Sequence, residues 1–320
     1  MSKSYEKIDY NLRPAKCTER KIIIDIIRSF LDNQNFAKDY QYIGFGSIFY
    51  NDFRLFHKNF GIKEMICIES EKDDADRFKF NLPYKSIDLI MEHSSDAINQ
   101  INWDKKTIIW LDYDLPMEKS MLDDIFNTFS FLKDNSIFIF SCNRSFQRYF
   151  DSNSHEYNVN KFKNDFGDYT PFRIKPSDLT MSNSHKMLSN LIEITINSSL
   201  KERNSIIKND INKLNFEKLF KFNYADGAPM FTVGGIISLK ENLKRIQIKK
   251  RKLYFPGKDN FNIETPLITN KEMTLLNSKL PNTFKRFSKY KAFSFIPDKY
   301  VESYYNLYRY LSIYSEIIEK

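Results

Sequence analysis

The chain has 320 residues, a formal net charge of +8 and a hydrophobic fraction of 42%. This length suits one large domain with an appendage, or two domains, and the hydrophobic fraction excludes a disordered chain. No apolar run approaches the roughly eighteen residues that cross a bilayer, and the N-terminus lacks a signal-peptide core. Two of the three cysteines, Cys67 and Cys142, fall in expected buried strands, so we expect a cytoplasmic protein with no membrane partner.

The positive charge is concentrated in the last quarter of the chain. Residues 240–320 contain 17 Lys and Arg against 8 Asp and Glu, whereas residues 1–239 contain 32 against 33. The densest basic run extends from Lys244 to Lys252. Such a run is most often a solvated surface, and the alternative is a contact for nucleic acid or another polyanion.

The N-terminal residues 1–36 predict a helical segment. Ile22, Ile23 and Ile26 give residues 18–31 an apolar helical face, and Pro14 fixes a turn ahead of it. Arg13 and Lys16 precede this helix. They are either ordinary surface cations or a lid that folds over the following glycine turn to contact an anionic substrate or ligand.

The next stretch has the order strand, glycine turn, helix, strand. The apolar segment that begins at Gln41 ends in the glycine turn Gly44-Phe45-Gly46-Ser47. A helix is expected over 48–60, and a second strand ends in Glu69 and Ser70. This is the opening unit of a doubly wound nucleotide-binding domain. Glycines leave bare main chain for a ligand, a helix starting near Ser47 would offer unpaired N–H groups, and Glu69 would accept hydrogen bonds from ribose hydroxyls.

Three more strands alternate with helices, which predicts a parallel sheet. The third strand, 87–91, is followed by Ser95-Asp96-Ala97 at the start of a short helix. The fourth, 107–111, is almost wholly apolar and ends in Asp112-Tyr113-Asp114. The fifth, 136–141, ends in Cys142-Asn143-Arg144.

The remaining chain predicts an insertion, a hairpin and a helical tail. Residues 145–183 have no clean period and are too long for a connector, so we interpret them as a substrate-side insertion or lid. A helix over 184–209 is followed by strands 218–224 and 230–239, joined by a turn at Gly227, which adds an antiparallel pair at one sheet edge. We therefore expect a domain over 37–240 and a basic, mostly helical region over 241–320, with a last helix from 298 to about 318.

Together these residues resemble class I S-adenosylmethionine-dependent methyltransferases, over residues 38–240. The resemblance implies an α/β fold, namely a doubly wound, mainly parallel seven-stranded sheet with an antiparallel edge hairpin. It implies that Gly44 to Ser47, Glu69 and Ser70 bind S-adenosylmethionine. It also implies that Asp96, within Ser95-Asp96-Ala97, contacts the adenine amino group, and that Asp112 to Asp114 form the catalytic motif, with Asp112 also near the cofactor.

The longer pattern, from Leu12-Arg13-Pro14-Ala15-Lys16 to Leu111-Asp112-Tyr113-Asp114, resembles uncharacterised bacterial proteins labelled O-methyltransferase-like. Some of these occur in anti-phage gene clusters. The chain departs from the family's first motif, because Tyr42 stands at the position of its acid and Ile48 at that of its third glycine. The Asn/Asp-Pro-Pro-aromatic motif of amino-group methyltransferases is absent, which disfavours methylation of base nitrogens.

Asp112, Asp114 and Asn143 also partly resemble the Mg²⁺ ligands of catechol-type O-methyltransferases. In those enzymes an Asp-Asn pair follows strand five, and here Cys142 replaces the Asp. A magnesium site is therefore an alternative to two plainer interpretations. In those, Asp114 caps the following helix and Asn143 is a turn residue.

We expect methyl transfer to a hydroxyl, with Asp112 or Asp114 as base or metal ligand. Tyr113 would pack on the acceptor or on the methionine end of the cofactor, and Arg144 would join Arg13 and Lys16 in contacting substrate. The acceptor is a small molecule, a nucleotide or a nucleic acid. Two alternatives stay open: a non-catalytic nucleotide-ligand sensor of the same fold, and a nucleic-acid-modifying methyltransferase that uses the basic C-terminal region.

Overall fold

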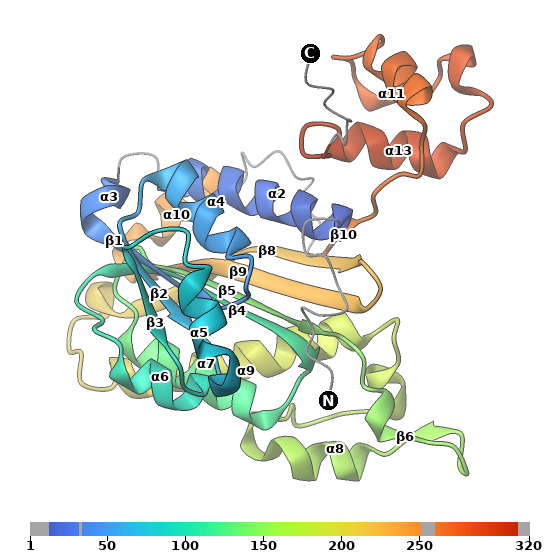
Figure 1. Ribbon diagram of the computed structural model, residues 1–320. Coiled ribbons are helices and arrows are strands. Elements are labelled where there is room, and N and C mark those ends of the chain that lie inside the picture. Colours follow the sequence, from blue (N-terminus) through green and yellow to red (C-terminus); the bar gives the residue numbers. More distant parts are fainter. Residues whose placement is uncertain (1–12, 32–33, 251–259, 313–320) are drawn as a thin grey trace.

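The computed structural model describes residues 13–31, 34–250 and 260–312. One sheet runs through the centre of the molecule, with helices on both of its faces and a small helical lobe beyond one edge (Figure 1). The sheet has eight strands in the order β10-β8-β9-β5-β4-β1-β2-β3. Their bounds are β1 (Tyr40–Phe45), β2 (Glu64–Ile68), β3 (Ile87–Ile90), β4 (Lys106–Pro116), β5 (Ile137–Asn143), β8 (Leu214–Ala225), β9 (Pro229–Leu239) and β10 (Phe261–Ile263).

Strand directions confirm the predicted fold class. Strands β1 to β5 pair in parallel, and β9 is antiparallel to both β5 and β8. The seven expected strands are joined by β10, a three-residue strand that pairs in parallel with β8. The order reverses at β1, which lies between β2 and β4, so the carboxyl ends of these strands form a topological switch point.

Two hydrophobic cores lie on opposite faces of the sheet. Strand β4 serves both, because Ile108 and Trp110 join one core and Ile109 and Leu111 join the other. This two-residue alternation with apolar side chains on both faces accounts for the unbroken apolar run in the sequence. Helices on the first face are α2 (Pro14–Phe30), α3 (Phe36–Asp39), α4 (Asn51–Phe60), α5 (Ala75–Phe80) and α10 (Leu243–Lys250), and those on the second are α6 (Ser94–Gln100), α7 (Lys119–Phe131), α8 (Val159–Phe166) and α9 (Ser184–Asn204).

Several element boundaries differ from the sequence prediction. Helix α2 begins at Pro14 rather than at residue 18, and α4 begins at Asn51 because Tyr50 adopts a left-handed conformation with φ of 49°. Strand β4 continues to Pro116, so Asp112 to Asp114 lie within the strand. Glu118 occupies the N-cap position of α7 without a side-chain capping hydrogen bond, so Asp114 is not its N-cap.

The insertion and the C-terminal region contain further short elements. The insertion holds a two-stranded sheet, β6 (Phe150–Asp151) with β7 (Glu156–Tyr157), and α8. The lobe contains α11 (Asn270–Asn277), α12 (Phe284–Phe287) and α13 (Asp298–Leu307) around a core of its own. Helix α13 ends at Leu307, earlier than predicted, where the chain turns so that the Tyr310 hydroxyl donates to Asp25 of α2.

Within the described part of the chain, no helix combines the length and the apolar character needed to cross a membrane. The division into three regions stays a prediction.

The hairpin offers a direct test of its packing. A Cβ atom built on Gly234 would lie 2.2 Å from the ring of Phe220. Gly234→Ala should therefore lower the free energy of unfolding by about 1–3 kcal/mol, as overpacking of a core does. Urea unfolding measures this loss. The loss in the double variant Gly234→Ala with Phe220→Leu should be smaller than the sum of the two single losses by roughly 1 kcal/mol. Strict additivity would contradict the assigned contact.

Candidate active site

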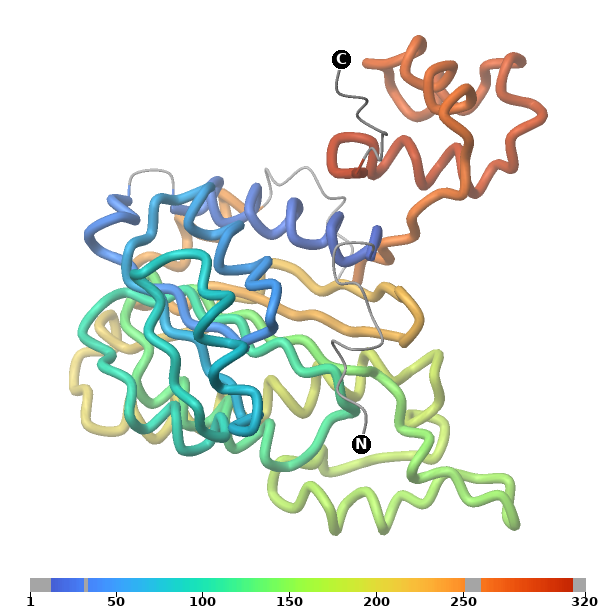
Figure 2. Tube along the Cα trace, viewed as in Figure 1, coloured from blue at the N-terminus to red at the C-terminus, as the bar shows by residue number. Residues whose placement is uncertain are grey.

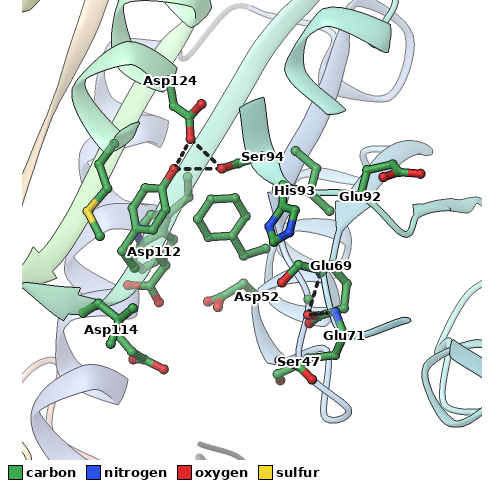
Figure 3. Close-up of a pocket in the computed structure, with 18 of the residues that line it drawn as sticks. Ser47, Asp52, Glu69, Glu71, Glu92, His93, Ser94, Asp112, Asp114 and Asp124 are labelled. Atoms are coloured by element: carbon green, nitrogen blue, oxygen red, sulfur yellow. Dashed lines mark hydrogen bonds between the residues drawn. The ribbon is translucent and has the colours of Figure 1, made fainter. Parts of the chain in front are cut away.

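A cavity of about 710 Å³ opens at the switch point, at the carboxyl ends of β1, β2 and β4. Its volume lies within the usual range for small-molecule sites. Figure 3 shows Asp112 and Asp114 on one side of it and Ser47 and Glu69 on the other. The wall includes Arg20, Tyr42, Phe45, Gly46, Ser47, Asp52, Ile68, Glu69, Ser70, Glu71, Glu92, His93, Ser94, Ser95, Trp110, Asp112, Tyr113, Asp114, Leu115, Glu118, Met121 and Asp124.

Glu69 is fixed beside the glycine turn. The backbone N–H groups of Ser70 and Glu71 donate to its Oε1 at 2.8 and 3.1 Å. A Cβ on Gly46 would lie 2.9 Å from Cys67 Sγ and 3.1 Å from Glu69 Oε2, so only glycine lets the turn approach this carboxyl group. Burial outweighs the two backbone hydrogen bonds and raises the pKa of Glu69.

Tyr42, at the position of the family's acid, fills the space behind the turn. Its ring stacks on Phe56 at 4.2 Å between centroids. A Cβ on Gly44 would lie 2.7 Å from the Tyr42 hydroxyl oxygen, so Gly44 admits this side chain. Tyr42 rather than Gly44 is therefore part of the cavity wall.

Asp112 is bound by a buried lysine. Lys16 Nζ lies 2.8 Å from Asp112 Oδ1, 3.0 Å from Glu19 Oε2 and 4.3 Å from the centroid of the Trp110 ring. It also donates to the Tyr224 hydroxyl at 3.1 Å. Burial alone would lower the pKa of Lys16, but Asp112 and Glu19 raise it well above its ordinary value.

The lid interpretation of Lys16 and Arg13 is therefore wrong for Lys16. The Lys16 side chain is only 4% exposed, because α2 packs it against the sheet beneath Asp112. Arg13 Nη1 lies 3.9 Å from Asp114 Oδ1, so Arg13 reaches the acid-rich end of β4 rather than the glycine turn.

The start of α2 is held by the edge hairpin. Asp226, in the turn between β8 and β9, accepts hydrogen bonds from the backbone N–H groups of Ala15 and Lys16 at 3.2 and 2.8 Å. A carboxyl group at this place satisfies backbone donors that have no partner within the helix, and it interacts favourably with the positive end of the helix dipole. Figure 2 shows the N-terminal helix, in blue, beside the gold hairpin.

A second acid and its cation were missed by the sequence argument. Arg20, one helical turn after Lys16, donates from Nε and Nη2 to the two carboxylate oxygens of Asp52 at 2.6 and 2.9 Å. Burial alone would raise the pKa of Asp52, but Arg20 holds it below its ordinary value. The four-residue spacing of Lys16 and Arg20 was the available signal, since it places two cations on one helix face.

The hydroxyl of Tyr113 is engaged within the cavity wall. Its hydroxyl donates to Asp124 Oδ2 at 2.5 Å, and Ser94 Oγ donates to the same oxygen at 2.5 Å (Figure 3). Its ring meets Phe45 edge-on at 4.7 Å. Burial raises the pKa of both Tyr113 and Asp124. Tyr113 thus supports the wall through its ring, and Asp124 is a wall residue that the sequence argument missed.

Besides Gly44, Arg13 and Lys16, four more predicted site residues lie outside the cavity wall. Helix α6 begins at Ser94, which leaves Asp96 exposed on its first turn and Ala97 buried in the core, so Ser94 and Ser95 line the cavity instead. Asn143 Oδ1 accepts from the backbone N–H of Ser145 at 2.9 Å, as a turn residue does. Arg144 Nη1 donates to the Met181 carbonyl at 2.7 Å, inside the insertion.

The donor set does not fit a magnesium site. Asp112 is engaged by Lys16, and the amide oxygen of Asn143 is engaged by Ser145. Within the described ranges, no cluster of three or more His, Cys, Asp or Glu side chains is arranged to hold a metal ion. The methyl transfer proposed for this site uses no metal ion.

Comparison with known proteins gives the family. A family model described as "Putative O-methyltransferase" matches residues 8–319. The chain belongs to this family. No curated protein matches it. The family and the strand order agree that the fold is that of a class I methyltransferase.

Three solved structures show a distant likeness. Trm1 from Pyrococcus horikoshii, in complex with S-adenosyl-L-methionine, is 12% identical over 79% of this chain and 61% of that one, with a TM-score of 0.46. The O-methyltransferase from Bacillus cereus, in complex with SAH, is 9% identical over 73% and 86%, with a TM-score of 0.39. A probable spermidine synthase from Corynebacterium glutamicum is 12% identical over 39% and 48%, with a TM-score of 0.34. The chain thus spans about half of the last protein and under two thirds of Trm1.

The buried cluster around Lys16 predicts a large effect of one substitution. Lys16→Met leaves Glu19, which is fully buried, without its cation. The free energy of unfolding should fall by about 3–5 kcal/mol, as when one partner of a buried pair is removed. Urea unfolding of Lys16→Met and of Lys16→Met with Glu19→Met provides the comparison. The double variant should regain most of the loss, and an equal loss in both would contradict this role.

Proposed function

We propose that the protein transfers the methyl group of S-adenosylmethionine to a hydroxyl oxygen of an acceptor. The observation that carries the proposal is the cavity itself. A glycine turn and a fixed carboxyl group, Glu69, form one side, and the acids of β4 form the other. Ligands of such sheets bind at the switch point, and a methyl donor on one side of this cavity would face an acceptor on the other.

The charge of the wall supports this donor. Eight carboxyl groups line the cavity, and Arg20 is the single Lys or Arg among the described lining residues. Such a field favours a ligand with positive groups, as S-adenosylmethionine has in its sulfonium and ammonium. It disfavours a dinucleotide, whose pyrophosphate is anionic. Gly46 leaves bare main chain beside Glu69, which suits a ribose close to the turn.

The two acids of β4 suit different tasks. Asp112 Oδ1 lies 2.8 Å from Lys16 Nζ, so one side of this carboxyl group is already occupied by a cation, and we assign Asp112 to the positive part of the donor. The side chain of Asp114 is 42% exposed at the cavity wall, and Arg13 Nη1 lies 3.9 Å from its Oδ1. We assign Asp114 as the base that accepts the hydroxyl proton of the acceptor.

The bound donor supplies a methyl group that is already activated on sulfur. The protein therefore has to align the acceptor oxygen opposite the carbon–sulfur bond and to accept one proton. The oxygen–carbon bond forms as the carbon–sulfur bond breaks, the proton moves to Asp114, and the sulfur leaves as a neutral thioether. Leu115 and Met121 line the same wall and give it an apolar part against which the acceptor can pack.

Glu69 should make donor binding depend on pH. Burial raises its pKa, so Glu69 becomes protonated at a higher pH than an ordinary glutamate and loses its capacity to accept ribose hydrogen bonds as the pH falls. Calorimetric titration with S-adenosylmethionine between pH 8 and 5 should show affinity falling on the acid side. Glu69→Gln should bind roughly tenfold more weakly at pH 8 and lose that dependence, as one charge-assisted hydrogen bond predicts.

Glu92→Gln is the matched control, because Glu92 lines the same cavity but pairs with Lys72 at 2.8 Å. An unchanged affinity and pH profile in Glu69→Gln would exclude Glu69 from the donor site.

Replacing Asp114 should lower the rate of methyl transfer and leave the affinity for the donor unchanged. With donor labelled in its methyl group and a metabolite extract as the acceptor source, Asp114→Asn should lower the transfer rate by roughly 10²–10⁴-fold. Its affinity for S-adenosylmethionine should stay within about twofold of the wild type. Asp96→Asn, on the exposed face of α6, is the control. Tight donor binding by the wild type without transfer to any hydroxyl would indicate a sensor of the same fold instead.

A further inference from the structure

The C-terminal lobe carries a short, exposed basic segment outside the cavity. Between residues 284 and 297 the sequence contains Lys285, Arg286, Lys289 and Lys291 and no acidic residue. All four cations are exposed. Lys285 and Arg286 lie in the short helix α12, Lys289 lies in the turn after it, and Lys291 begins the next helical turn. All four belong to the lobe that stands apart from the sheet in Figure 1. We refer to residues 284–295 as the lobe surface.

Three aromatic side chains are exposed among these cations. Phe284 is 39% exposed, Tyr290 36% and Phe295 66%. Large apolar side chains alternate here with positive charges along twelve residues. A ring presented beside cations matches a ligand that carries both flat apolar faces and negative groups.

Packing within the lobe holds two of these rings in place. Phe284 packs on Tyr305 at 5.1 Å between centroids. The Tyr290 hydroxyl accepts from Asn282 Nδ2 at 3.1 Å, and its ring lies 5.6 Å from that of Phe293. Phe293 belongs to the buried core of the lobe. These two rings are therefore oriented before any ligand binds, which reduces the entropy lost on binding.

The basic run from Lys244 to Lys252 is less suited to this task. Lys250 Nζ lies 2.6 Å from Glu217, and Lys249 Nζ donates to the Phe30 carbonyl at 3.4 Å. These contacts tie α10 to the sheet and to α2. Arg251 and Lys252 lie outside the described residues. A polyanion contact at this run stays a prediction, and the lobe surface is the better placed of the two.

We propose that the lobe surface binds single-stranded nucleic acid, with its cations on the phosphates and its rings stacked on unpaired bases. A duplex offers phosphates but hides the faces of its bases, so it would use the cations and not the rings. An anionic membrane is disfavoured, because α12 has four residues and forms no amphipathic helix that could lie in the interface. The proposal does not depend on the methyl acceptor.

Fluorescence anisotropy with labelled oligo(dT) and oligo(U) tests the proposal on the full chain. Replacing Lys285, Arg286, Lys289 and Lys291 by Ala should weaken binding at least tenfold at about 0.1 M salt. Each lost phosphate contact should also reduce the slope of log Kd against log salt by about 0.7. The matched control replaces four exposed lysines of the sheet region, Lys58, Lys63, Lys79 and Lys85, by Ala and should bind as the wild type does.

Phe295→Ala separates stacking from charge. It should weaken binding to single strands by roughly five- to a hundredfold, with the salt slope unchanged and duplex binding unaffected. Thermal unfolding of each variant reports whether the lobe stays folded. The proposal is overturned if the wild type fails to bind single strands, if the control variant loses as much affinity, or if anionic vesicles are bound in their place.

Discussion

The ion pair between the buried Lys16 and the partly exposed Asp112 is the contact on which the rest of the site depends. It joins the first described helix to β4 at the point where that strand leaves the core and becomes a wall of the cavity. A buried ammonium group is tolerated only when its neighbours compensate the lost water. Glu19, Tyr224 and the Trp110 ring provide that compensation, from α2, β8 and β4. The cation beside Asp112 is thus held in place by three elements assembled together.

The sheet could be predicted because its strands carry strong local patterns. A strand buried on both faces needs a continuous apolar run, and Ile108 to Leu111 provide one. The tight turn at Gly227, whose φ is 99°, indicated a reversal of direction at the sheet edge. Strand β10 escaped prediction because three residues, Phe261 to Ile263, are too few to show a period. Helix starts were misplaced where distant residues decide them, as Asp226 does at α2.

Within the site, the residues fixed by local backbone geometry could be predicted, and those fixed by contacts between distant segments could not. The glycine turn and Glu69 belong to one βαβ unit, so their adjacency follows from local order. Arg20 and Asp52 are 32 residues apart, and Lys16 and Asp112 are 96 apart, and no period in the sequence links either pair. Asn143 ends β5 and Arg144 follows it, but their side chains bind Ser145 and Met181 and lie outside the cavity wall.

The cap that Asp226 places on α2 has a consequence for the order in which the chain becomes functional. The two backbone donors of α2 and their acceptor are 211 and 210 residues apart, so the helix leaves the ribosome long before its cap exists. Until β8 and β9 are made, Lys16 lacks its contact with Tyr224, and the backbone N–H groups at the start of α2 lack their contact with Asp226. Before the hairpin is made, the surroundings that Lys16 and Asp112 have in the folded protein are therefore incomplete. A nascent chain that ends before β8 lacks the finished site.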